Sequence, residues 1–364
     1  MSDLLYKIAL TKINGVGSIT ARQLVSYCGG AKEVFEASKK SLLSIPTIGP
    51  VTVDAITNSD ALKKSETELE FIEKHKIQAL SYNDAAFPQR LKHQHDCPFL
   101  LYYRGNADLN HYRVVGIVGT RKPTPYGEAM CREIIEGLES YNIMVISGLA
   151  YGIDVTAHKK CLELGIHNVG AIAHGMASMY PSEHRKVAAQ MIECGGLITE
   201  HTSEVQPDPR HFPMRNRLIA GICDALFVVE TANSGGSMIT AEIAHSYNKD
   251  IFALPGKTKD KYSQGCNLLI KNNKAALIES AEDIAKNMNW ELLDEKKVIQ
   301  TNLFVELNDT EKKLIDILKA QGDRSIDELS YVFKLQPSEM AAMLLGLEFQ
   351  GVIKSLPGKR YCIL

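Results

Sequence analysis

Residues 111 to about 286 alternate between short apolar runs and stretches of helical length, and this alternation constrains the fold more than any other feature. The runs that have the length of buried strands are Val114–Val118, Ile143–Ser147, Val169–Ala173, Leu197–Glu200, Ala225–Glu230 and Ile251–Ala253. The stretches expected as helices are Tyr126–Ser140, Val155–Leu164, Glu183–Glu193, Arg215–Ile222 and Ser237–Tyr247. Buried strands that alternate with helices predict an α/β fold, a mainly parallel sheet with helices on both faces.

Regions of a different pattern flank this α/β region on both sides. Residues 1–60 are expected to form short helices, and residues 61–110 a connector that ends in a strand at Pro98–Tyr103. Residues 287–308 are rich in Asn, Glu, Asp and Lys, which is typical of a linker, and residues 309–364 are expected to be a small separate domain.

The amino-terminal helices are joined by glycine turns. Ile13-Asn14-Gly15-Val16-Gly17 precedes a predicted helix, which is typical of a helix-hairpin-helix or SAM-like region. Such a turn exposes backbone N–H groups that could hold a phosphate. The alternative is a small helical cap that binds no ligand, which is favoured because glycine turns between helices are common.

The last 56 residues predict a winged helix. Asp309 can cap a helix that ends at Ala320, Ser325 a second to Phe333, and Pro337 begins a third. Two short strands, Val352–Ser355 and Tyr361–Leu364, are expected to form a hairpin. Because eight basic residues are balanced by eight acidic ones and the third helix carries no basic residue, a protein-contact or DNA-end-sensing role is favoured over reading of duplex DNA.

Small or glycine-rich loops follow four of the predicted strands and precede helices: Gly119–Lys122, Ser147–Asp154, His174–Met176 and Asn233–Ser237. The carboxyl ends of parallel strands meet at one edge of a sheet, where ligands collect. Backbone N–H groups in these loops could bind an anion, and Arg121 and Lys122 add positive charge. A groove for a polyanion or a nucleotide at this edge is therefore favoured over loops that are glycine-rich only to pack tightly.

A second basic cluster lies at Arg210–Arg217. Arg210 and Arg215 are expected to contact phosphates, and Phe212 could stack on a base. For Arg217 two interpretations stand side by side: a phosphate contact, or an ion pair with a carboxylate such as Glu200 or Glu230.

Composition and missing motifs exclude several classes of protein. A net charge of −2 gives no global attraction to nucleic acid, so a polyanion site must be local. The apolar runs are too short to cross a bilayer, the first 18 residues lack the pattern of a signal peptide, and the eight cysteines never form Cys-x-x-Cys. No P-loop, dinucleotide fingerprint or Gly-x-Ser-x-Gly elbow is present. We therefore expect a cytoplasmic protein that is not an enzyme, without catalytic residues, a metal site or a cofactor.

Several motifs of the central region together resemble the DprA family of DNA-processing proteins, also called Smf. They occur in the family's order from Gly119 to Ile270. The motifs are Gly119-Thr120-Arg121, Ser147-Gly148-Leu149-Ala150-Tyr151-Gly152-Ile153-Asp154, Tyr180-Pro181, Phe212-Pro213-Met214-Arg215-Asn216-Arg217, Ser237-Met238-Ile239-Thr240-Ala241, Ala253-Leu254-Pro255-Gly256 and Gly265-Cys266-Asn267-Leu268-Leu269-Ile270.

The resemblance implies an extended Rossmann-like, doubly wound domain that binds single-stranded DNA without cutting it. It also implies a homodimer that protects incoming strands and loads the RecA recombinase in natural transformation. Ser182 and His184 stand where family members often carry Lys and Asn, and Arg185 is expected to replace the missing lysine. The residues expected to bind single-stranded DNA are Gly119, Thr120, Arg121, Lys122, Ser147, Gly148, Ala150, Tyr151, Gly152, Arg185, Phe212, Arg215, Asn216, Arg217 and Ser237.

A competing hypothesis comes from a different class of protein. The stretch Ser234–Glu242 loosely resembles the Pro-Gly-Gly-x-Gly-Thr-x-x-Glu motif of the nucleotide phosphoribohydrolases called LOG. In that interpretation the protein hydrolyses a nucleoside monophosphate, Glu242 is the catalytic carboxylate and Arg121 holds the phosphate.

Overall fold

The computed structural model of the chain describes residues 3–292, 308–349, 352–356 and 360–363. The chain forms two compact units, Met1–Leu292 and Leu293–Leu364, which are described separately. Within the described residues, no helix combines the length and the apolar composition that a membrane span requires.

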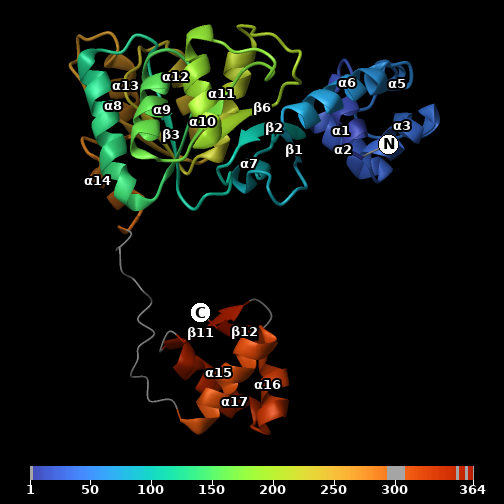
Figure 1. Cartoon of the computed structure of the whole chain (residues 1–364), viewed down its shortest axis with the longest axis vertical. Coiled ribbons are helices and arrows are strands. Elements are labelled where there is room, and N and C mark those ends of the chain that lie inside the picture. The colour runs from blue at the N-terminus through green and yellow to red at the C-terminus, as the bar shows by residue number, and fades with distance from the viewer. Residues whose placement is uncertain (1–2, 293–307, 350–351, 357–359, 364) are drawn as a thin grey trace. The chain divides into compact units, whose positions relative to one another are not determined.

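The first unit is built on a nine-stranded sheet in the order β1-β2-β6-β5-β4-β3-β7-β8-β9 (Figure 1). The strands β3 to β9 are parallel, and β1 and β2 add two antiparallel strands at one edge. The strands are β1 (Gln78–Ser81), β2 (Leu100–Gly105), β3 (Val114–Val118), β4 (Met144–Ser147), β5 (Asn168–Ala171), β6 (Gly195–Thr199), β7 (Ala225–Val228), β8 (Asp250–Ala253) and β9 (Ala276–Leu277).

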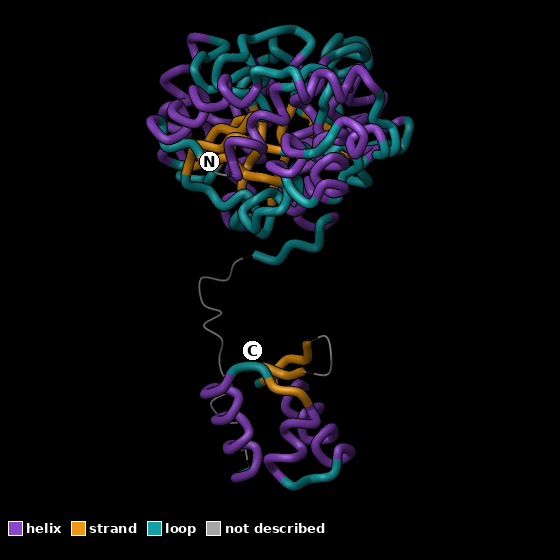
Figure 2. Tube along the Cα trace, turned by 90° about the vertical axis from the view of Figure 1, so that its right-hand side faces the viewer, coloured by secondary structure: helices purple, strands orange, loops and turns teal. Residues whose placement is uncertain are grey.

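Helices cover both faces of this sheet (Figures 1 and 2). They are α7 (Gln89–Lys92), α8 (Pro125–Leu138), α9 (Ile153–Leu164), α10 (Arg185–Glu193), α11 (His211–Ile222), α12 (Gly236–Ser246), α13 (Gln264–Lys271) and α14 (Ala281–Asn287), with 3₁₀ turns at Glu139–Tyr141 and Ser182–His184. Val115 and Ile117 of β3 pack toward α8 and α9, whereas Val114 and Val118 pack toward α11 and α12. Successive strand residues point to opposite faces, so a strand covered on both faces must be apolar throughout.

The amino-terminal helices are α1 (Asp3–Lys12), α2 (Ser18–Cys28), α3 (Ala31–Glu36), α4 (Lys39–Leu43), α5 (Pro50–Thr57) and α6 (Ala61–Lys74). Their core is continuous with Phe99, Leu100 and Tyr102 at β2. The residues expected as a connector thus contribute α6, β1, α7 and β2 to the first unit, two of them strands of the central sheet.

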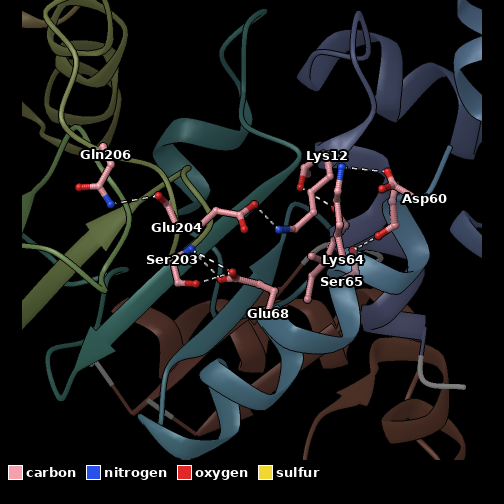
Figure 3. A network of polar contacts seen from close by, with 11 residues as sticks. Lys12, Asp60, Lys64, Ser65, Glu68, Ser203, Glu204 and Gln206 are labelled. Atoms are coloured by element: carbon pink, nitrogen blue, oxygen red, sulfur yellow. Dashed lines mark hydrogen bonds and ion pairs between the residues drawn. The ribbon is translucent and has the colours of Figure 1, made fainter.

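A polar network also attaches these helices to the loop that follows β6 (Figure 3). The carboxylate of Glu68 on α6, which is almost fully buried, accepts hydrogen bonds from the backbone N–H of Ser203 at 2.9 and 3.0 Å and from its hydroxyl at 2.6 Å. Lys12 at the end of α1 pairs with Glu204 at 2.6 Å. The same loop runs on to the start of α11, so α1 and α6 support its course.

The described residues of the second unit form three helices and a three-stranded sheet in the order β10-β12-β11. The elements are α15 (Asp309–Gln321), β10 (Arg324–Ser325), α16 (Ile326–Phe333), α17 (Pro337–Phe349), β11 (Ile353–Leu356) and β12 (Arg360–Ile363). Ser325 caps α16 as predicted, but the prediction for Asp309 was wrong by one residue. Asn308 caps α15 in a capping box with Glu311, because its side chain folds back onto two N–H groups of the first turn.

The predicted fold class is confirmed: a mainly parallel sheet, an amino-terminal helical region and a carboxyl-terminal winged helix. Most predicted helices and strands differ from the structure by one or two residues at their ends. The exception is α11, which begins at His211 rather than Arg215, since Pro213 is tolerated in a first turn where its missing N–H has no partner to lose. Most of the linker predicted over residues 287–308 lies outside the described residues.

Candidate functional site

The strand order reverses direction between β3 and β7, and a cavity lies at the carboxyl ends of these two strands. The chain proceeds from β3 to β6 on one side and returns to β7 on the other. Loops that leave neighbouring strands in opposite directions open a crevice at such a point, which is where doubly wound folds bind ligands. We call this cavity of about 520 Å³ the switch-point cavity.

Two positions at this edge, 148 and 152, are glycine because the neighbouring loops approach too closely to leave room for a side chain. A Cβ atom on Gly148 would lie 2.0 Å from the Nη1 atom of Arg215. Gly152 has a φ of 77° and its Cβ would lie 2.3 Å from the backbone oxygen of Thr120. The loop after β4 therefore packs on the loop after β3 and on Arg215 without side chains in between.

Arg121 forms one wall of the cavity together with two aromatic rings. Its guanidinium lies over the ring of Phe212 at 5.5 Å from the centroid, and Tyr180 meets the same ring edge-on at 5.8 Å. The Arg121 side chain has no hydrogen bond or ion pair with any described residue, so its charge is available to a ligand. Cation and exposed π-faces side by side provide phosphate contact and base stacking.

Arg215 is a buried cation in the same cavity. The residue is 5% exposed, its Nη1 atom donates to the backbone oxygen of Ala171 at 2.7 Å, and its Nε atom has no partner. Burial lowers the pKa of Arg215 to about 10, an effect that the nearby Asp154 opposes. Burial likewise raises the pKa of Asp154, against the influence of Arg215. A guanidinium with unused donors at a cavity wall is a site for an anion.

The amino terminus of α12 forms another part of the cavity wall. Gly235 precedes the helix without a side-chain cap, and a Cβ on Gly236 would meet no atom within 4 Å. The hydroxyl of Ser237 is buried and has no hydrogen-bond partner. Unpaired N–H groups at the start of a helix attract anions. This wall therefore offers donors to a phosphate and leaves it room to approach the backbone.

The predicted site residues separate into three groups. Eight line the switch-point cavity: Gly119, Thr120, Arg121, Ala150, Phe212, Arg215, Asn216 and Ser237. Gly148 and Tyr151 line a small side pocket that shares Arg121, Ala150, Tyr180 and Phe212 with the cavity. The residues that line neither are Lys122, Ser147, Gly152, Arg185 and Arg217.

Arg217 does not line the cavity, and its contacts favour the ion-pair interpretation. Its Nη2 atom lies 2.5 Å from the carboxylate of Glu200, and its Nη1 atom donates to the backbone oxygen of Asp96. Arg215 and Arg217 are two positions apart on α11, about 200° around a helix of 3.6 residues per turn, so they point to different sides. The expectation that Arg217 lines the groove is not supported by this placement.

Other expected contacts also differ. Glu230 does not pair with an arginine; its carboxylate accepts hydrogen bonds from the backbone N–H and hydroxyl of Thr124, at 2.9 and 2.6 Å. Arg210 is highly exposed and pairs with Asp208 at 2.8 Å. Of the loop after β5, the predicted stretch His174–Met176 does not line the cavity, because Gly175 packs against the backbone of residues 202 and 203, whereas Tyr180 of the same loop does line it.

Sequence reasoning missed several residues of the cavity. Asp154 and Tyr180 belong to the family motifs, which is a signal that could have included them. Thr231 and Tyr262 carried no signal: they meet because the Thr231 N–H donates to the backbone oxygen of Tyr262 at 2.6 Å, far along the chain.

Two further geometric points concern chemistry. The described residues contain no group of three or more His, Cys, Asp or Glu side chains placed to hold a metal ion. Glu242, the carboxylate of the hydrolase hypothesis, does not line the cavity, and both its oxygens accept hydrogen bonds from Lys274 at 2.7 Å.

The chain is similar to proteins of one family along most of its length. The family model described as DNA recombination-mediator protein A matches residues 78–289, and the DprA winged helix domain matches residues 305–359. The Smf protein of Synechocystis is 28% identical over 99% of this chain and 98% of its own length. The DNA processing protein DprA of Bacillus subtilis is 33% identical over 74% of this chain and 92% of its own length.

Two solved structures agree with the fold. The crystal structure of DprA from Streptococcus pneumoniae superposes with a TM-score of 0.69 and 28% identity, covering 80% of this chain and 99% of that one. DprA from Helicobacter pylori, whose structure was studied for its single-stranded DNA binding mode, superposes with a TM-score of 0.54 and 24% identity over 59% of this chain and 98% of that one. The chain therefore belongs to the DprA/Smf family of DNA recombination-mediator proteins and carries the family's winged helix domain.

Proposed function

We propose that this protein binds single-stranded DNA in the switch-point cavity and acts as a recombination mediator, not as an enzyme. The observation that carries the proposal is the arrangement of Arg121: a cation without a carboxylate partner, stacked on Phe212 at the wall of a cavity whose other walls supply Arg215 and the start of α12. Phosphate donors beside aromatic faces suit a strand whose bases are unpaired.

The relatives support this assignment. The similar structure from Helicobacter pylori is of a protein that binds single-stranded DNA. By analogy with the family, this protein works in the cytoplasm as a homodimer, protects incoming strands and loads RecA onto them in natural transformation. Loading is measured by the rate at which RecA assembles on a labelled single strand with and without the protein.

The hydrolase hypothesis finds less support. A catalytic carboxylate must reach the substrate, and Glu242 is engaged by Lys274 outside the cavity. Release of free base from a nucleoside monophosphate, assayed with the purified protein, would restore that hypothesis.

The first prediction concerns Arg121. Arg121→Glu is expected to weaken binding to labelled oligothymidine at least tenfold, because a carboxylate then faces the phosphates and no cation stacks on Phe212. The measurement is fluorescence anisotropy across a salt series, on the single strand and on its duplex.

Lys159→Glu serves as the control, because Lys159 is exposed on α9 and lines neither pocket. We expect that variant to bind within about twofold of wild type, since a distant exposed charge is screened. Equal binding by wild type and Arg121→Glu would place the DNA elsewhere, and wild-type preference for duplex would refute the proposal.

A further inference from the structure

A second cavity, lined by residues of α10, β2 and β6, lies apart from the switch-point cavity. We call it the α10 cavity; it has a volume of about 330 Å³. It lies across residues 173–180 from the side pocket beside Arg121, and Ile172 lines both. Its two charged lining residues are Arg104, from β2, and Arg185, from the start of α10.

These two arginines differ from most others in the described chain. Arg90, Arg132, Arg210, Arg217 and Arg360 are each ion-paired to a carboxylate. The side chains of Arg104 and Arg185 have no hydrogen bond or ion pair with any described residue. Arg121, in the switch-point cavity, shares this property. Guanidinium groups left without carboxylates beside a cavity are suited to bind a phosphate.

The remaining lining is apolar or small. Met176, Met179, Ile192 and Leu197 contribute thioether and aliphatic surface, and no acidic side chain lines the cavity. Flexible methionines pack against flat aromatic groups. The volume is at the lower end of the range for small-ligand pockets, which suits a single base with its phosphate.

We propose that the α10 cavity is a second contact for the same single strand, in which Arg104 and Arg185 bind a phosphate and the methionine-lined surface receives a base. The strand then crosses residues 173–180 between the two cavities. This inference rests on the proposed function. The sequence alone predicts Arg185 in the same groove as Arg121, whereas this inference places it in the α10 cavity.

A length series separates the two cavities. Site sizes for single-strand grooves are about 4 to 16 nucleotides, so oligothymidines of about 4 and about 16 nucleotides are titrated by anisotropy. The variant Arg104→Glu/Arg185→Glu is expected to bind the long strand at least tenfold more weakly and the short one within twofold of wild type. The slope of log affinity against log salt on the long strand should be shallower by about 0.7 for each phosphate that the variant no longer neutralises.

Lys186→Glu is the matched control, since it reverses one exposed charge next to Arg185 without lining the cavity. Arg104→Gln/Arg185→Gln repeats the test without added negative charge, and thermal unfolding checks that each variant is folded. Binding of the long strand equal to that of the control would overturn the proposed role of the α10 cavity.

The other outcomes are also decisive. Arg121→Glu should weaken binding of both the short and the long strand. If it does so while the double variant binds like wild type, the proposed function stands and only the role of the α10 cavity is refuted. If wild type binds neither length, the proposed function fails and the role of the α10 cavity fails with it. Tight binding of a free nucleotide or an acidic peptide at Arg104 and Arg185, with no length effect, would assign the cavity to another ligand.

Discussion

Arg215 and Arg217 are close together on α11, but one lines the switch-point cavity and the other forms an ion pair outside it. Arg215 faces the switch-point cavity with donors unused, whereas Arg217 is 14% exposed at its side chain and is ion-paired with Glu200. Removing one partner of a buried pair leaves the other charge without compensation. Arg217 thus stabilises the junction of α11 with the loops at Asp96 and Glu200.

Arg217→Met is therefore expected to lower the free energy of unfolding by about 3 kcal/mol while leaving DNA binding by the folded protein within about twofold. Urea unfolding and anisotropy measure the two effects. The double variant Arg217→Met/Glu200→Met should recover part of the stability. Arg210→Met, which removes an exposed pair, should leave the unfolding midpoint unchanged. A large drop in DNA affinity in folded Arg217→Met would show that Arg217 does contact DNA.

His158 on α9 is a buried neutral histidine. Asn168 donates through its amide nitrogen to the backbone oxygens of Ile166 and Cys194, so its amide oxygen accepts from His158 Nδ1 at 2.9 Å. His158 Nε2 is buried without a partner. Burial lowers the pKa of His158 to about 4, because the protonated ring would carry a charge without hydration inside the protein.

Because the folded pKa of His158 lies below its unfolded value of about 6.5, the unfolded state binds more protons between these values, and stability is lost as pH falls. From about pH 7 to pH 5, the His158 side chain should lower the free energy of unfolding by about 2 kcal/mol. Urea unfolding at both values should show a smaller pH dependence for His158→Gln than for wild type. Exposed His245→Gln should keep the wild-type dependence, and a dependence unchanged in His158→Gln would contradict the assignment.

At the scale of elements, α6 shows how a helix outside the central sheet can position a loop of the binding region. Its Glu68 holds the backbone and hydroxyl of Ser203, and the chain then passes through Pro209 to Phe212 at the cavity. A buried carboxylate with three hydrogen bonds fixes the start of this loop (Figure 3).

Glu68→Ala is expected to lower the free energy of unfolding by about 2 kcal/mol, because the N–H and hydroxyl of Ser203 lose their acceptor in a buried place. It should also weaken DNA binding through the loop. Urea unfolding and anisotropy test both, with Glu70→Ala, exposed on the same helix, as the control. Equal stability of the two variants would refute the role of Glu68.

At the scale of the whole molecule, the last residues of the first unit, Trp290 and Glu291, pack against that unit itself. Trp290 packs beside the core under α8 and α14, and its ring lies 5.7 Å from the Arg113 guanidinium. Arg113 Nη1 also donates to the backbone oxygen of Glu291 at 2.8 Å. These contacts end within the first unit, which closes at Leu292.

A chain that ends at Leu292 is thus expected to keep the unfolding midpoint of the first unit and to bind oligothymidine within about twofold of the full chain. The physical reason is that the winged helix region has balanced charge and adds little to phosphate attraction. A chain that ends at Asn287 lacks Trp290 and Glu291 and should unfold at a lower temperature. Thermal unfolding and anisotropy compare the three lengths, and a large drop in affinity for the chain that ends at Leu292 would assign DNA contacts to the second unit.

The periodicity of this sequence was enough to predict the strands β3 to β8 and the helices α8 to α12 of the central region, apart from the start of α11. Strands such as β3 and β7 are apolar throughout because both their faces are covered, and helices such as α8 and α12 alternate with them. Local patterns set local structure, so α16, with its Ser325 cap, could also be predicted.

Only the tertiary structure decided which of the predicted residues meet. It turned Arg217 toward Glu200, moved Arg185 to another cavity and brought Tyr262 to Thr231. It also placed β1 and β2 in the central sheet. The reason is physical: periodicity reports how each segment is buried, whereas the neighbour of a side chain depends on strand order and on helix rotation, which are fixed only when the whole core packs.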